Sequence, residues 1–250
     1  MSTHTTDNSM FRPIANLLGE NFSIQSDSNT NNLIKTELLN NAFDCYNHNQ
    51  KPLKFIQQDE HLPYAELGYE ERIYLHGMIA TRSLNWHDFF NALVWKTFPQ
   101  SKCAINAIHY KELKQQKSTL RSQRRDLLTL FDECGVVIIA DNDVVDMIRK
   151  HKWHELFIDN KHRWLSGEIK IITFGHAMYE KYLSPYIGMT AKALLLTKEI
   201  ENLDEYLAKK LIADEILINK AELSPLPVLG IPNWHKGQNK SFYSDKNYFR

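Results

Sequence analysis

The middle of the chain contains three consecutive stretches in which apolar residues recur three and four residues apart. This spacing predicts helices from about Asn85 to Phe98, from Pro99 to about Gln116 and from about Ser118 to Glu133. Asn85 is suited to an N-cap, and Pro99 is suited to a first helical turn. The first helix is apolar almost all round, so we expect it to be buried.

After Gly135 the pattern changes to short apolar or β-branched runs that alternate with helical stretches. The expected strands are 136–140, 169–174 and 193–197, and the expected helices are 144–150, 176–183 and 203–219. Because parallel neighbouring strands need crossover connections, this alternation predicts a small, mainly parallel sheet. Together with the three earlier helices it predicts a helix-rich α/β fold.

The first part of the chain is less regular. We expect residues 1–32, which are largely polar, to form a largely disordered segment in which Phe11–Leu18 can dock. A helix is predicted at Leu33–Tyr46 and a strand at Lys54–Gln57. Residues 33–250 are predicted to form a single globular domain, since their number suits one hydrophobic core.

The last thirty residues combine proline with aromatic side chains. Three prolines exclude a regular helix there, and they are Pro225, Pro227 and Pro232. The aromatic side chains of this segment include Phe242, Tyr243, Tyr248 and Phe249. Since a mobile tail rarely carries so many aromatic residues, we expect a C-terminal tail that is docked on the domain.

Composition disfavours several classes of protein. Lys plus Arg and Asp plus Glu number 30 each, which argues against a protein that mainly coats nucleic acid or an anionic membrane. The three cysteines are widely spaced and include no C-x-x-C pair, which disfavours a disulfide framework and a cysteine zinc site. With no signal peptide and no apolar run of about 18 residues, we expect a cytoplasmic protein without a membrane partner.

Polar and ionisable side chains lie on the apolar faces of the predicted helices. In the first helix His87 and Asn91 are four residues apart and share a face, and Asp88 lies beside them. Burying a polar side chain without a partner costs roughly 1–3 kcal/mol, so these groups must find partners or face a cavity. The second helix repeats the pattern with Lys102, Asn106 and His109.

The third helix carries Arg125 and Asp132 on one face and Glu133 on the next. Arg125 is suited to pair with a carboxylate of a neighbouring helix, for which Asp88 is one candidate. Far along the chain, His176 lies where a predicted strand becomes a helix, and such strand ends usually face the ligand crevice of a parallel sheet. We therefore predict one polar pocket, whose members are His87, Asp88, Asn91, Asn106, His109, Arg125, Asp132, Glu133 and His176.

Two hypotheses assign chemistry to this pocket. In the first, Asp132, Glu133 and His176 bind a divalent transition metal, and the protein is a metal-dependent hydrolase. In the second, Asn106 and Arg125 anchor an unknown anionic or amide-bearing small molecule, and a histidine moves protons. The catalytic candidates are His87, Asp88, His109 and Arg125, and the ligand-binding candidates are Asn91 and Asn106. A nucleophilic Cys103 is a further hypothesis, although a small residue in such a helix is more often a packing residue.

Non-enzymatic roles are the alternatives, since networks of His, Asp, Asn and Arg often only hold helices together. A basic run predicts phosphate contacts to nucleic acid, through Lys111, Lys114, Lys117, Arg121 and Arg124. A protein-interaction role would require a large exposed apolar patch. The chain lacks the motifs G-x-S-x-G, G-x-x-x-x-G-K and G-x-G-x-x-G, which disfavours the α/β-hydrolase, P-loop and Rossmann classes.

Four stretches of the chain resemble one protein family. They are TRSLNWHDFFNALVWKTFPQSKCAINAIH, RRDLLTLFDECG, FGHAMYEKYLSP and the ending PLPVLGIPNW…NKSFYSDKNYFR. The family is the bacterial one known as domain of unknown function 3025, and the resemblance covers about residues 69–250. It implies a bacterial source and a shared architecture, and it implies no reaction.

Overall fold

The computed structural model describes residues 9–18, 36–115, 122–197 and 199–250. The chain divides into two compact units, each built from stretches that are distant in the sequence. Unit 1 comprises Met1–Ile24, Leu130–Ile200 and Lys220–Arg250, and unit 2 comprises Gln25–Thr129 and Glu201–Asn219. The boundary falls within the helix α6 (Gln123–Cys134). The single domain expected over residues 33–250 remains a prediction.

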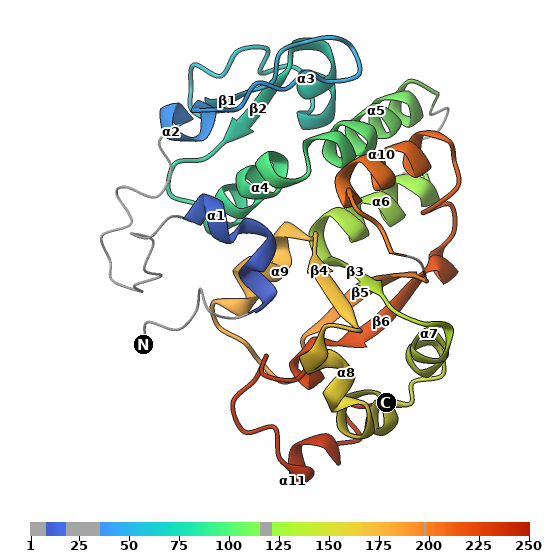
Figure 1. Cartoon of the computed structure of the whole chain (residues 1–250). Helices are drawn as coiled ribbons and strands as arrows, with labels where there is room; N and C mark the ends of the chain where they lie inside the picture. The colour runs from blue at the N-terminus through green and yellow to red at the C-terminus, as the bar shows by residue number, and fades with distance from the viewer. Residues whose placement is uncertain (1–8, 19–35, 116–121, 198) are drawn as a thin grey trace. The chain divides into compact units, whose positions relative to one another are not determined.

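Unit 1 is built around a four-stranded sheet in the order β4-β3-β5-β6 (Figure 1). Its strands are β3 (Gly135–Ile139), β4 (Lys170–Thr173), β5 (Thr190–Leu196) and β6 (Leu223–Pro227). Every position of β3 is buried, as its run of β-branched residues predicts. The helix-rich α/β fold is therefore confirmed.

The sheet is mixed, which corrects the expectation of a mainly parallel one. β3 and β5 run parallel, whereas β3 with β4 and β5 with β6 are antiparallel. Between β3 and β4 the chain passes through α7 (Asn142–Arg149), the π-helix η3 (Glu155–Asp159) and α8 (Lys161–Ser166). These elements return it to the end of the sheet where β3 finishes, so that Ile139 pairs with Lys170. Alternation of strands and helices therefore does not determine strand direction.

Both ends of the described chain pack in unit 1. The segment η1 (Ser9–Ile14) packs against β4, buries Met10 and Phe11, and continues into α1 (Ala15–Leu18). The rest of the segment 1–32 lies outside the described residues. The C-terminal tail contains η4 (Lys220–Glu222), β6, η5 (Val228–Gly230) and α11 (Lys240–Tyr243).

The tail is docked, as predicted. The indole Nε1 of Trp153 donates a hydrogen bond to the backbone O of Arg250 at 2.6 Å, and the hydroxyl of Tyr248 donates to the backbone O of Met189 at 2.7 Å. Pro225 and Pro227 fit β6 because it is an edge strand of the described sheet, where a residue without an N–H is tolerated.

Unit 2 combines a parallel pair of strands with several helices. The strands are β1 (Lys54–Gln57) and β2 (Met78–Thr81), and the helices are α2 (Thr36–Asn40), α3 (Tyr69–His76), α4 (Trp86–Thr97), α5 (Pro99–Gln115) and α10 (Leu203–Ile212). α3, α4 and α10 all pack against α5, and α10 lies alongside it (Figure 1). The predicted N-cap of α4 is confirmed, because the Asn85 side chain accepts a hydrogen bond from Asp88 N at 3.0 Å. Of the described helices, none is long and apolar enough to cross a membrane.

Two helices are shorter than their patterns predict. The described part of α2 ends at Asn40 instead of near Tyr46. The Asn40 carboxamide bonds the backbone of Phe55 at this point, donating to its O at 2.9 Å and accepting from its N at 2.8 Å. α10 ends at Ile212 instead of Asn219. Tertiary contacts override a helical pattern at such positions, because intrinsic helix propensities are small.

Candidate functional site

Asp88, a predicted catalytic residue, is held in an ion pair at the start of α4. Its carboxylate accepts hydrogen bonds from the backbone N, Nε and Nη2 of Arg82, at 2.8, 2.9 and 2.8 Å. Burial alone would raise the pKa of Asp88, but the hydrogen bonds from Arg82 outweigh it, so the pKa is lowered. Asp88 thus has Arg82 as its cationic partner and not Arg125, the partner that the sequence suggested. The neighbouring His87 is half-buried.

Asn91, a predicted ligand-binding residue, belongs to a chain of hydrogen bonds that joins three helices. Its Nδ2 donates to the hydroxyl of Tyr69 on α3 at 2.9 Å, and its Oδ1 accepts from Nζ of Lys102 on α5 at 2.9 Å. Lys102 is 3% exposed, and its Nζ also lies 5.1 Å from the centroid of the Trp95 ring, within cation–π range. These contacts tie α3 and α5 to α4.

Asn106 and His109 lie on the same buried face of α5, after Lys102. Asn106 Nδ2 donates to the backbone O of Glu70 at 2.9 Å and to its Oε2 at 2.6 Å. The exposed fractions of Asn106 and His109 are 1% and 2%, so both lie within the helix packing of unit 2. Arg125 is half-buried in the first turn of α6. A binding or catalytic role for these residues remains a prediction.

Two of the predicted metal ligands, Asp132 and His176, come together in unit 1. His176 Nδ1 lies 3.7 Å from Asp132 Oδ2, between the end of α6 and the start of α9 (His176–Tyr182). The third, Glu133, contributes its backbone O to the close packing around Gly175. Among residues 9–18, 36–115, 122–197 and 199–250, no group of three or more His, Cys, Asp or Glu side chains is placed to hold a metal ion. The divalent metal remains a prediction.

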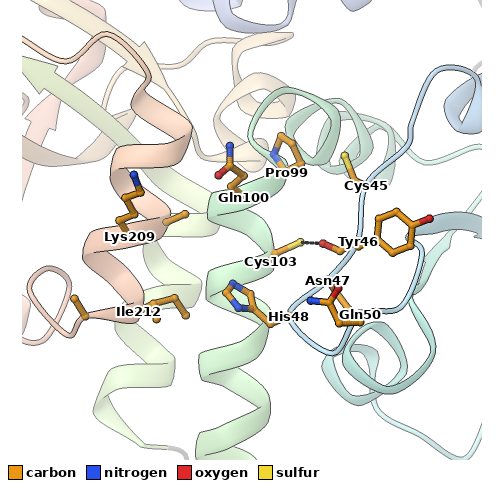
Figure 2. Close-up of a pocket in the computed structure, with 12 residues that line it drawn as sticks. Cys45, Tyr46, Asn47, His48, Gln50, Pro99, Gln100, Cys103, Lys209 and Ile212 are labelled. Carbon is orange, nitrogen blue, oxygen red and sulfur yellow. Dashed lines mark hydrogen bonds between the residues drawn. The ribbon is translucent and has the colours of Figure 1, made fainter.

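A pocket of about 690 Å³ opens in unit 2. None of the nine residues of the predicted polar pocket lines it, but Cys103, the hypothetical nucleophile, does. Its walls are the loop Cys45–Gln50, the first turns of α5 and the last turns of α10 (Figure 2). Figure 2 shows α10 and the loop on opposite sides of α5, with the ring of His48 between them. The lining is mixed: it includes the apolar side chains Pro99, Cys103, Ala208 and Ile212 and the polar side chains Asn47, His48 and Gln100.

The loop wall of the pocket is held by Asn47, which is 2% exposed. Its Nδ2 donates to the backbone O of Ile73 and Tyr74 at 2.6 and 2.9 Å. Its Oδ1 accepts from the backbone N of Asn49 and Lys51 at 2.9 and 3.0 Å. The carboxamide therefore uses its full hydrogen-bonding capacity to tie the loop to the end of α3.

The two helical walls are clamped together by Asp204, in the first turn of α10. Its carboxylate accepts hydrogen bonds from the backbone N of Gln100 at 2.9 Å and of Ser101 at 2.7 Å, and Ser101 Oγ donates to the Asp204 backbone O at 3.0 Å. N–H groups in the first turn of a helix have no partner within the helix and favour negative charge. Asp204 therefore caps α5 from a neighbouring helix and sets the spacing between two walls of the pocket.

Three ionisable side chains of the pocket wall, Cys45, His48 and Cys103, have pKa values shifted in the direction that favours the neutral form. Burial, together with the nearby Cys45 and Asp204, raises the pKa of Cys103 to about 12. Burial also raises the pKa of Cys45, with smaller contributions from the carboxylates of Asp44 and Asp204. Desolvation lowers the pKa of His48, which favours the neutral imidazole. The Cys103 thiol is thus protonated, and the geometry does not support a nucleophilic role for it.

Two polar side chains in the lining remain available to a ligand. The Gln100 carboxamide and the His48 imidazole make no hydrogen bond within the part of the chain that the structure describes. The charged Lys209, at the rim, pairs instead with Glu205, one turn earlier on α10. Sequence reasoning missed this pocket, because the loop Cys45–Gln50 fell partly inside a predicted helix and carries no motif.

The basic run that predicts nucleic-acid contacts is partly neutralised in unit 2. Lys114 Nζ lies 3.0 Å from Glu71 Oε1, and Arg124 Nη2 lies 2.5 Å from Asp214 Oδ1. Lys111 is exposed. Lys117 and Arg121 lie outside the described residues. Phosphate binding by this run remains a prediction.

The fold and the pocket define a helix-rich α/β protein with a cavity of ligand size. Residues 53–250 match the family described as "Protein of unknown function (DUF3025)", and the chain belongs to that family. No curated protein and no solved structure matches the chain significantly. The matched region includes α5 and α10 but not the loop Cys45–Gln50.

Proposed function

We propose that this protein binds a small, uncharged and largely apolar molecule in the pocket of unit 2. The observation that supports the proposal is the preformed cavity of about 690 Å³ between the loop Cys45–Gln50, α5 and α10. Cavities of this size, mostly apolar with a few placed polar groups, are typical of small-molecule sites. Because Asn47 and Asp204 already hold the walls, little conformational entropy is lost when a ligand enters. Binding of a small molecule is also a hypothesis from the sequence, but its site there is at Asn106 and Arg125, which do not line this pocket.

The chemistry of the lining supports an uncharged ligand. Moving an unpaired charge out of water is costly, and the charged side chains nearby, Asp204 and Lys209, already have protein partners. The Gln100 carboxamide and the neutral His48 ring each offer a donor and an acceptor. The pocket therefore fits a molecule with an amide-like edge on an apolar or aromatic body.

Three probes of nearly the same shape test this selectivity. They are benzamide, benzoate and benzylamine, which at neutral pH are neutral, anionic and cationic. In saturation-transfer NMR with the full chain we expect benzamide to bind with an affinity of about millimolar, as is typical of fragments, and the two charged probes to bind several-fold more weakly.

Two tryptophan variants show whether binding occurs in the pocket. Ala213 is an exposed residue of the pocket rim, and Ala65 is an exposed residue of unit 2 that does not line the pocket. Ala213→Trp should remove the benzamide signal, because the indole covers the opening, whereas Ala65→Trp should retain it. Equal signals from both variants, or benzoate bound as well as benzamide, would contradict the proposal.

A further inference from the structure

In unit 1 the thiol of Cys134 and the amine of Lys181 face each other. Lys181 Nζ donates a hydrogen bond to Cys134 Sγ at 3.3 Å. Cys134 is the last residue of α6, and Lys181 lies in the last turn of α9. Both side chains are half-buried, so a small oxidant in solution can reach them. Thiols that react with oxidants are typically partly exposed and lie beside a cationic side chain.

The backbone around this pair holds the two helices in place. Gly175, which precedes α9, donates from its N to the backbone O of Gly135 at 2.7 Å. A Cβ at Gly175 would lie 2.5 Å from both Glu133 O and Gly135 N, so the end of α6 and the start of α9 are in direct backbone contact. The rings of Phe131 and Phe174 stack beside this contact, with centroids 4.7 Å apart. The approach of Lys181 to Cys134 therefore follows from the packing of unit 1.

We propose that hydroperoxides convert this pair into a covalent, reversible sulfenamide between Cys134 Sγ and Lys181 Nζ. First, the sulfur attacks hydrogen peroxide, the O–O bond breaks and an S–O bond forms, giving the sulfenic acid of Cys134 and one water. Second, the Lys181 ammonium releases a proton to solvent, and its nitrogen attacks the sulfur. The S–O bond breaks, and the hydroxyl leaves with an amine proton as a second water. The sulfur is oxidised by two electrons, and the peroxide is reduced by two.

The position of Lys181 is what directs the sulfenic acid to this product. Sulfenic acids condense with a nearby thiol or nitrogen nucleophile, and at Cys134 the nitrogen of Lys181 is already in hydrogen-bond contact with the sulfur. The new S–N bond joins the end of α6 to α9, next to Asp132 and His176. Free thiols reverse it by attacking the sulfur, so the modification responds to the redox state of the surroundings. This site is independent of the ligand proposed for unit 2.

The test uses full-length protein with Cys45→Ser and Cys103→Ser, in which Cys134 is the single thiol and no intramolecular disulfide can form. After treatment with hydrogen peroxide we expect intact-mass spectrometry to show a loss of about 2 Da that dithiothreitol restores, because sulfenamide formation removes two hydrogens overall. Proteolysis should yield one peptide that joins Cys134 to Lys181.

Lys181→Arg in the same background is the matched control. The guanidinium keeps a positive charge beside the sulfur but is a poor nucleophile, so the mass loss should disappear and the sulfenic acid, trapped with dimedone, should accumulate. Circular dichroism confirms that the variants fold alike. A mass loss that persists in Lys181→Arg overturns the proposal. So does a parent protein that shows only oxygen addition, or no change in mass.

Discussion

Cys103 in unit 2 and Cys134 in unit 1 are the same residue type in opposite surroundings. Cys103 is buried in the pocket wall, where its thiol donates a hydrogen bond to the backbone O of Tyr46 at 3.6 Å and desolvation raises its pKa to about 12. Cys134 is half-buried and accepts a hydrogen bond from Lys181. The first thiol lies beside a hydrogen-bond acceptor, whereas the second is partly exposed beside a cationic donor, which is the typical environment of a reactive cysteine. The neighbours of a cysteine, more than its presence, therefore indicate its chemistry.

The two regions also differ in how they are held together. In unit 1, α6 and α9 meet through backbone atoms, and Gly175 leaves room for no side chain between them. In unit 2, α5 and α10 are joined by the carboxylate of Asp204 at the N-terminus of α5. A side chain added where two backbones are in contact forces them apart and is strongly destabilising. Removal of the Asp204 side chain, in contrast, loses only the free energy of its hydrogen bonds. Three experiments test these contrasts.

The largest expected effect is on the alkylation rates of the two thiols. Only the thiolate reacts, and raising the pKa of Cys103 from 9.0 to about 12 lowers its thiolate fraction about a thousandfold at neutral pH. We expect iodoacetamide to modify Cys134 far faster than Cys103 in the native protein, as peptide mass spectrometry can measure. The rate of alkylation at Cys103 should rise about tenfold per pH unit, because the pKa of this thiol lies above the pH range in which the protein stays folded. Equal rates for the two thiols at neutral pH would contradict the comparison.

The second effect is on stability, through Gly175→Ala. A methyl group there meets backbone atoms of Glu133 and Gly135 that cannot move aside, so we expect the free energy of unfolding in urea to fall by about 2–3 kcal/mol. Gly167→Ala is the control, since Gly167 has φ +83° but open space around its Cβ position. The control should cost only the backbone strain, about 1 kcal/mol. If both variants lose the same amount, the contact between α6 and α9 is not tight.

The smallest effect is expected for Asp204→Ala in unit 2. The variant loses the hydrogen bonds to the N of Gln100 and Ser101, and removal of a helix cap typically costs about 1–2 kcal/mol. Asp204→Asn is the matched control, because its amide oxygen still accepts one of these bonds, and it should retain part of the stability. An unfolding free energy unchanged in Asp204→Ala would show that Asp204 does not hold α5 and α10 together.

Much of the fold follows from local patterns that can be recognised in the sequence. The cap at Asn85, the first turn at Pro99 and the buried strand β3 were all predictable, because capping, proline geometry and β-branched runs act over a few residues. The polar residues Asn91 and Asn106 were predictable as groups that must find partners. Their partners, Tyr69 and Glu70, were not, since these lie 22 and 36 positions away in the sequence.

The remaining features depend on contacts between residues that are far apart in the chain. The pocket requires the amides of α5 to meet Asp204, 104 positions after Gln100, and the thiol–amine pair requires Cys134 to meet Lys181, 47 positions later. The direction of β4 depends in the same way on how three short elements return the chain to the sheet. Periodicity and capping residues specify individual helices and strands, because the interactions behind them act between residues that are close in the sequence. Which elements meet depends on the free energy of the whole packed unit, and no short stretch of residues contains that information.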